Sequence, residues 1–239
     1  MAVPAILFEK FFLAPCKSRF IALQAHCFLR GLGVQVKISM LIPCHNEELS
    51  IRACLESALA QSRPIDQILV VNDGSTDRSG EILREYEEKY KSKIEVLHIP
   101  IATGNKSYAQ ERGVQHIKGD IFIATDGDTI LHTNFVELIE KDFKDPQVAA
   151  VGGYVRSLKH NWLTACRELD YAIGQDLHKV AQAELGFLFV IPGCAGAFRT
   201  DVFKSQVRFE HDTVTEDLDF TFRLHRTGHK ILYNRKAIS

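Results

Sequence analysis

The sequence predicts an α/β fold with a mainly parallel central sheet flanked by helices. Runs that are apolar throughout, such as ISMLIP and QILVV, alternate from Lys37 onward with segments whose apolar residues recur at helical spacing. Strands buried on both faces read as continuous apolar runs, and their alternation with helices is typical of parallel sheets. Polar residues follow these runs, and ligands of such sheets bind at the carboxyl ends of the strands.

The first half of the chain gives the clearest elements. Each apolar run is followed by polar residues, and each amphipathic segment is long enough for a helix. Asn46 is expected to cap the first helix. In chain order, the expected strands are 38–43, 67–71, 94–99 and 120–125, and the expected helices are 46–62, 79–90 and 107–117.

The second half is less regular. A long helix is expected over 161–183, with Trp162 packed rather than exposed, and the run FLFVI is expected to form a strand that enters the bend PGCAGAFR. A helix with acids in its first turn starts at TED and ends near Gly228. Strands are expected at 148–156 and 230–234.

Composition restricts the class of partner and the compartment. The formal net charge is −1, so no overall positive field favours nucleic acid as a partner. The six cysteines form no CxxC pair, which favours reduced thiols in the cytoplasm over disulfides or a zinc site. No run of the sequence looks like a membrane-spanning helix, which needs about 20 apolar residues.

Residues 1–36 differ from the rest. They are apolar with interspersed lysines and arginines, and they lack the order of regions found in a signal peptide. We expect a leader or an amphipathic segment there, and attachment to a membrane surface or to a membrane-embedded partner remains open.

The stretch Asp126-Gly127-Asp128 ends an expected buried strand. Two carboxylates this close repel each other unless a cation or hydrogen bonds compensate. Mg²⁺ or Mn²⁺ would do so, since both accept oxygen ligands and Mg²⁺ commonly bridges phosphates of a substrate. The alternative is an ordinary solvated turn, because Asp and Gly are common turn residues.

Three other stretches carry polar chemistry with equally ordinary alternatives. Asp73 could accept a hydrogen bond from a nucleobase or cap a helix, and Lys106 could meet an anionic donor or stay solvated. Asp217 in TED could act as a general base or simply favour the helix start, where TVTE also fits a capping box. The small residues of PGCAGAFR could leave room for an acceptor or form a tight bend in the core.

The ordered series LIPCHNEE, VVNDGSTD, GNKSYAQERG, ATDGDT, PGCAGAFR and TEDLD resembles the inverting glycosyltransferases of family 2, which have the GT-A fold. Among these it is similar to the synthases of poly-N-acetylglucosamine, chitin, hyaluronan and cellulose. The resemblance implies one GT-A catalytic domain over 37–239, with a nucleotide-binding half at 37–130 and an acceptor-binding half at 131–239.

The resemblance also implies a role for each motif. Asp73 would contact the uracil of a UDP-sugar, with Glu47 and Lys106 on the nucleoside side and Asp126 near the ribose and diphosphate. Asp128 would ligate Mg²⁺ or Mn²⁺, and Asp217 would be the base. The acceptor side would be formed by Gly193, Cys194, Ala195, Gly196, Arg199 and Glu216.

The expected reaction moves a sugar, with UDP-N-acetylglucosamine as first choice, to a saccharide or other hydroxyl acceptor with a β-linked product. The Gln-x-x-Arg-Trp motif of the polysaccharide synthases is missing after TED, so a C-terminal truncation relative to the family is expected. One alternative is therefore a catalytically incomplete domain that binds nucleotide sugars. A remote one is a phosphohydrolase of the haloacid dehalogenase type, because TDGDTIL resembles its DxDGT loop. The expected location is cytoplasmic, with the inner face of the membrane as an option.

Overall fold

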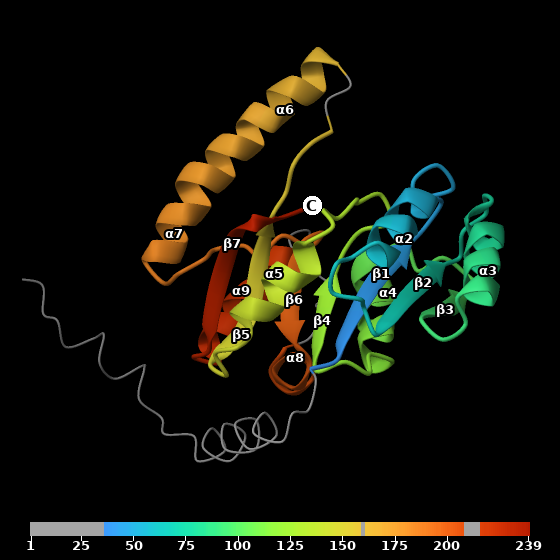
Figure 1. Ribbon diagram of the computed structural model, residues 1–239, viewed down its shortest axis with the longest axis horizontal. Helices are drawn as coiled ribbons and strands as arrows, with labels where there is room; N and C mark the ends of the chain where they lie inside the picture. Colours follow the sequence, from blue (N-terminus) through green and yellow to red (C-terminus); the bar gives the residue numbers. More distant parts are fainter. Residues whose placement is uncertain (1–35, 159–160, 208–215) are drawn as a thin grey trace, which may run out of the picture. The chain divides into compact units, whose positions relative to one another are not determined.

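The computed structural model describes residues 36–158, 161–207 and 216–239, although not the side chain of Glu216. The expected leader at 1–36 lies outside these residues, apart from Val36. The described part contains a seven-stranded sheet in the order β3-β2-β1-β4-β6-β5-β7 (Figure 1). The strands are β1 (Ile38–Cys44), β2 (Gln67–Asp73), β3 (Ile94–Ile99), β4 (Ile121–Ala124), β5 (Val148–Tyr154), β6 (Gly196–Arg199) and β7 (Lys230–Ile238).

Pairing within the sheet is parallel except around β6, which runs antiparallel to both β4 and β5. The prediction of a mainly parallel α/β fold is therefore confirmed. Because β4 and β5 both oppose β6, they run in the same direction and end at the same edge of the sheet.

Helices cover both faces of the sheet. Apolar residues of α2, α3 and α5 pack into one core cluster, and those of α4, α8 and α9 pack into a second one on the other face. The bounds are α2 (Ile51–Leu59), α3 (Ser79–Lys89), α4 (Lys106–Gln115), α5 (Phe135–Asp142), α8 (Thr200–Gln206) and α9 (Glu216–Arg226).

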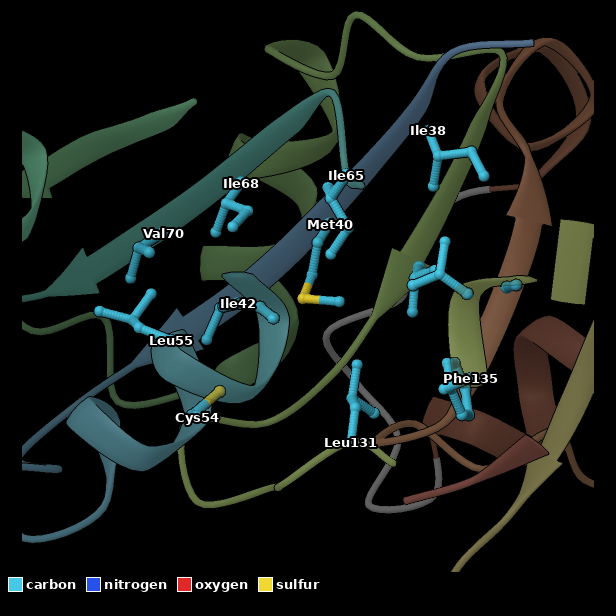
Figure 2. Packing of buried hydrophobic residues seen from close by; sticks show 14 of the residues in the cluster. Ile38, Met40, Ile42, Cys54, Leu55, Ile65, Ile68, Val70, Leu131 and Phe135 are labelled. Carbon is cyan, nitrogen blue, oxygen red and sulfur yellow. The ribbon is translucent and has the colours of Figure 1, made fainter. Parts of the chain in front are cut away.

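Strand β1 supplies side chains to both core clusters. Ile38, Met40 and Ile42 join the cluster of α2, whereas Leu41 joins the cluster of α4. Successive side chains of a strand point to opposite faces, so an uninterrupted apolar run supplies both clusters. In Figure 2, the side chain of Ile42 lies near Leu55 of α2, whereas Ile38 lies at the far end of the same cluster.

Two local expectations are wrong. Asn46 does not cap a helix: it has a positive φ of 56°, and its side-chain oxygen accepts a hydrogen bond from the backbone N–H of Thr76 at 2.8 Å. Residues 187–191 form no strand, and the strand of this region is β6, which takes up the second half of the stretch PGCAGAFR. Leu188 and Ile191 of that run are buried in the second core cluster, which explains its apolar composition.

The expected long helix is present as α6 (Trp162–Ala172), the π-helical segment η2 (Ile173–Lys179) and α7 (Val180–Glu184). It forms one continuous rod in Figure 1. Trp162 is 77% exposed, so the expectation that it packs is wrong. Among the residues that the structure describes, no helix is both long enough and apolar enough to span a bilayer.

Candidate active site

A pocket of about 460 Å³ lies at the carboxyl edge of the sheet, where β1, β2 and β4 end. Polar residues that follow these strands line it together with the start of α4. This is the edge at which parallel α/β sheets bind ligands. The lining residues are Pro43, Cys44, His45, Glu47, Asp73, Gly104, Asn105, Lys106, Ala109, Asp126, Gly127 and Asp128.

Asp73 is fixed by the loop that follows β3. It is the last residue of β2 and only 5% exposed. Its carboxylate accepts hydrogen bonds from the backbone N–H and the hydroxyl of Thr103, at 2.9 and 2.7 Å. The next residue, Gly74, has φ +60°, and a Cβ there would lie 2.2 Å from the backbone nitrogen of Ala102. A glycine is therefore needed to bring this loop against β2.

Lys106 and Asp126 form an ion pair inside the pocket, with Nζ 2.5 Å from Oδ1. Burial opposes the charge of Lys106, yet the carboxylates of Asp126 and Asp217 together raise its pKa above the ordinary value. The chain thus holds a lysine in its charged form beside the carboxylates at the sheet edge. A fixed cation at this position suits an anionic ligand such as a diphosphate.

Asp128 is exposed at the pocket rim, two residues after the paired Asp126. Between them, a Cβ on Gly127 would lie 3.1 Å from Cγ of Glu47, which keeps the turn close to the β1 loop. Glu47 is itself oriented by Ser50, whose hydroxyl donates to its carboxylate at 2.5 Å.

These carboxylates fit a hard divalent cation that takes its remaining ligands from substrate phosphate and water. Among the described residues, no group of three or more His, Cys, Asp or Glu side chains could hold a metal by itself. Asp128, as an exposed carboxylate, offers one ligand to a metal that arrives with a phosphate-bearing ligand.

Asp217 approaches the same edge from the first turn of α9. Its Oδ2 accepts a hydrogen bond from the backbone N–H of Gly193 at 2.9 Å. A Cβ at Gly193 would lie 2.7 Å from Oδ1 of Asp217, so only glycine allows this approach. The start of a helix is a favourable electrostatic position for a carboxylate.

Cys194 lies among these charged groups, because the charges of Asp126, Lys106 and Asp217 all act on it. Burial raises the pKa of its thiol to about 11, so it is a neutral thiol at pH 7. Ala195 and Gly196 follow, and Gly196 pairs with Ala124 at the carboxyl end of β4. The bend thus lies at the carboxyl edge of the sheet, in contact with Asp217.

Arg199 is not brought to this edge. It pairs with Ile121 at the opposite end of β4, and its guanidinium donates to the backbone oxygen of Val148 at 3.0 Å and to that of Phe143 at 3.3 Å. At 6% exposure it holds together the turn that leads into β5. Glu216 begins α9, but its side chain is outside the described part of the chain.

Two residues of the site were not singled out from the sequence. His45 lines the pocket and its Nδ1 donates to the backbone oxygen of Asp73 at 2.6 Å, which joins the ends of β1 and β2. The stretch PCHNEE contains His45, but nothing in the sequence distinguished this residue from its polar neighbours. Lys179 lies in η2, and burial lowers its pKa to about 8 although the charge of Asp217 opposes this. It lies in no motif, so sequence reasoning had no signal for it.

The mainly parallel sheet with a polar pocket at its carboxyl edge is a fold of the GT-A type. Residues 39–205 match the family described as Glycosyl transferase family 2, so the chain belongs to that family. The resemblance inferred from the ordered motifs is thereby confirmed.

Individual relatives agree with this assignment. The poly-β-1,6-N-acetyl-D-glucosamine synthase of Staphylococcus epidermidis is 27% identical over 203 residues, covering 84% of this chain and 48% of the relative. The chain therefore spans about half the length of the curated relatives that it matches. The mannosyltransferase PcManGT from Pyrobaculum calidifontis, solved with GDP-Man and Mn²⁺, has a TM-score of 0.70 and 18% identity, covering 92% of this chain and 64% of its own.

A third similar protein is TarS 1-349 of S. aureus, solved in complex with UDP-GlcNAc. It has a TM-score of 0.67 and 16% identity, covering 85% of this chain and 58% of its own. At such identities the likeness of the two solved structures bears on the fold, and it confirms the expected GT-A architecture.

Proposed function

We propose that this chain carries the catalytic domain of a metal-dependent inverting glycosyltransferase. It transfers a sugar from a UDP-sugar, with UDP-N-acetylglucosamine as the best candidate, to a hydroxyl group of a saccharide or other acceptor. The observation that carries the proposal is the arrangement of Asp73, the Lys106–Asp126 pair and Asp217 at one edge of the sheet. Two comparisons favour the choice of sugar: one relative is a poly-N-acetylglucosamine synthase and one similar structure holds UDP-GlcNAc.

The donor would bind in the 460 Å³ pocket. Asp73 and Glu47 offer acceptor oxygens to the nucleoside, and Asp126 lies toward the ribose and diphosphate. The ammonium of Lys106 offsets the negative charge of the diphosphate. The pocket volume falls within the ~300–1,000 Å³ that is usual for small-molecule sites.

Mg²⁺ or Mn²⁺ would be held by Asp128, where it would neutralise the charge that develops on the departing UDP. The chain's own contribution there is an exposed carboxylate beside the pocket. The presence of Mn²⁺ in the similar mannosyltransferase structure supports this choice of ion.

On the acceptor side, the carboxylate of Asp217 would take the proton from the attacking hydroxyl. The acceptor oxygen then bonds to the anomeric carbon while the bond from that carbon to the diphosphate oxygen breaks, and UDP leaves with the electron pair. A single displacement of this kind turns an α-linked donor into a β-linked product. General base catalysis contributes typically ~10²–10⁴-fold, which sets the loss expected when the base is removed.

UDP release from a panel of UDP-sugars, with and without Mn²⁺ or Mg²⁺, tests the proposal. Asp217→Asn is expected to lower transfer by at least about 100-fold, and Asp128→Asn should remove the dependence on metal. The matched controls are Asp219→Asn, on the same helix but paired with Arg223, and Asp120→Asn, at the opposite end of β4 where its carboxylate accepts from Lys37.

Three outcomes are distinguishable. Metal-dependent release that Asp217→Asn and Asp128→Asn abolish supports the proposal and names the donor. UDP binding without release from any donor favours the alternative of a catalytically incomplete nucleotide-sugar-binding domain. If Asp217→Asn retains full transfer, the assignment of Asp217 as the base is wrong.

A further inference from the structure

A second cavity lies at the carboxyl end of β5, next to α6 and η2. None of the described residues that line it also lines the donor pocket. Its volume of about 260 Å³ is below the ~300–1,000 Å³ usual for ligands of nucleotide or drug size. The cavity therefore suits a ligand group of about one sugar ring.

The charged side chains of this cavity cancel in pairs. Arg156 contacts Glu168 at 3.0 Å, and Arg235 contacts Asp176 at 2.8 Å. The guanidinium groups offer N–H donors and the carboxylates offer acceptors, yet the four side chains sum to no net charge. Such a lining favours an uncharged ligand with many groups that both donate and accept, which is the character of hydroxyl groups.

Two tyrosines also line the cavity. Tyr171 of α6 is 41% exposed, and the hydroxyl of Tyr154, the last residue of β5, donates to Asp176 at 3.2 Å. A tyrosine ring offers an apolar face while its hydroxyl keeps a polar partner, so it suits the C–H face of a sugar ring. Aromatic faces beside paired donors and acceptors are the chemistry of a saccharide site.

The π-helical segment η2 links this cavity to Asp217. Asp176 of η2 lines the cavity, and Lys179 of the same segment lies with Nζ 5.9 Å from the ring centroid of Tyr233. Lys179 is also within the electrostatic reach of Asp217 and Cys194. Three helical residues rise only ~4.5 Å, and π-helical turns are frequent at functional sites.

We propose that the cavity between β5, β7, α6 and η2 binds an uncharged sugar residue of the acceptor, near the residue whose hydroxyl meets Asp217. The inference rests on the proposed function and narrows the acceptor to a neutral oligosaccharide. The reacting end lies beside Cys194 and Asp217, and the preceding residue lies over the tyrosines and paired arginines of the cavity.

Calorimetric titration of the full chain with β-linked N-acetylglucosamine oligosaccharides of one, two and four units tests this without any donor. The tetrasaccharide is expected to bind more tightly than the monosaccharide. Arg235→Met and Tyr171→Ala should each weaken binding of the tetrasaccharide about five- to tenfold, by the usual value of one hydrogen bond or packing contact. Lys236→Met is the matched control, because it removes an exposed cation from the next position of β7, outside the cavity.

Several results would overturn the proposal: no binding by any of these oligosaccharides, equal affinity at every length, or unchanged affinity in both cavity variants. Tighter binding of a glucuronate-containing tetrasaccharide through the same residues would overturn the uncharged character of the ligand. Because no donor is present, a failure of the proposed transfer reaction would appear separately, as absent UDP release from the wild-type chain.

Discussion

Lys106 is under the electrostatic influence of two acids of the candidate site. Its ammonium contacts Asp126 at 2.5 Å, and the carboxylate of Asp217 also acts on it. Lys106→Met should leave the carboxylates of the sheet edge without their cation. We expect the free energy of unfolding in urea to fall by about 1–3 kcal/mol, the usual cost of leaving a partly buried polar group unsatisfied. The affinity for UDP should fall as well, since the diphosphate loses a fixed positive charge.

The matched control is Lys118→Met. Lys118 pairs with Glu95 at the same distance of 2.5 Å, but its side chain is 67% exposed and that of Glu95 is 41% exposed. Exposed pairs contribute little, so this variant should change stability by no more than about 0.5 kcal/mol. Equal effects of the two substitutions would contradict a special role for the Lys106–Asp126 pair.

Lys179 should give the chain a recognisable dependence on pH. Burial lowers its pKa from 10.5 in the unfolded chain to about 8 in the folded one. Between these values the unfolded chain binds more protons, so this residue makes folding more favourable as pH rises. Lys179→Met should therefore be more stable than wild type at pH 7, by roughly 1–3 kcal/mol, and this advantage should shrink toward about pH 10.

Urea unfolding of the variant and the wild type at both pH values measures this effect. Lys89→Met is the control, because Lys89 also lies over a tyrosine ring, 5.2 Å from the centroid of Tyr90, but is exposed. An advantage of Lys179→Met that is equal at both pH values would contradict the buried, titrating ammonium.

Among the candidate site residues, those at the carboxyl end of a strand could be placed at the sheet edge from the sequence. Asp73 and the Asp126–Asp128 stretch follow apolar runs, and parallel strands bring their carboxyl ends to one edge. Lys179 and Arg235 could not be found in this way, because their contacts come from residues distant in the chain. Arg199 was predicted to lie at the site because it belongs to the motif PGCAGAFR. Since β6 runs antiparallel to β4, Arg199 lies instead at the opposite edge of the sheet.

At the scale of elements, parallel strands were predicted correctly because burial on both faces leaves an uninterrupted apolar run. Strand β6 was misplaced because it has only four residues and follows a longer apolar run that packs in the core without pairing. The long helix was predicted from its spacing, but Trp162 shows that spacing does not reveal whether an apolar face is covered.

Helix α6 should open more readily than α4, although the two have similar lengths. None of the residues of α6 is buried, whereas α4 buries Ala109, Gly113 and Val114 among others. Local opening costs less where few side chains are buried. Native-state hydrogen exchange should give an opening free energy at least about 2 kcal/mol lower for α6 than for α4. Equal protection of both helices would contradict this.

For the whole molecule, binding of UDP together with a divalent metal ion should increase the global stability of the fold. A ligand that binds only the folded chain stabilises it by about 2.7 kcal/mol at 100 times its Kd, and about 1 kcal/mol corresponds to a shift in Tm of roughly 2–4 °C for a domain of this size. UDP with Mn²⁺ should therefore raise Tm by several degrees. UDP alone should raise Tm less, because the carboxylates of Asp126 and Asp128 line the proposed diphosphate site and would lack the compensating charge of the metal.

Asp128→Asn provides the decisive comparison in this thermal measurement. It should keep the response to UDP alone and lose the extra shift caused by Mn²⁺, since an amide is a poorer ligand for a hard cation than a carboxylate. Asp120→Asn, at the amino end of β4 and away from the pocket, should respond as the wild type does. A shift with UDP that is the same with and without Mn²⁺ in the wild type would remove the metal from the proposed mechanism. In that outcome Asp73 and Lys106 would still form the proposed donor site, because the contacts to UDP proposed for them do not involve the ion.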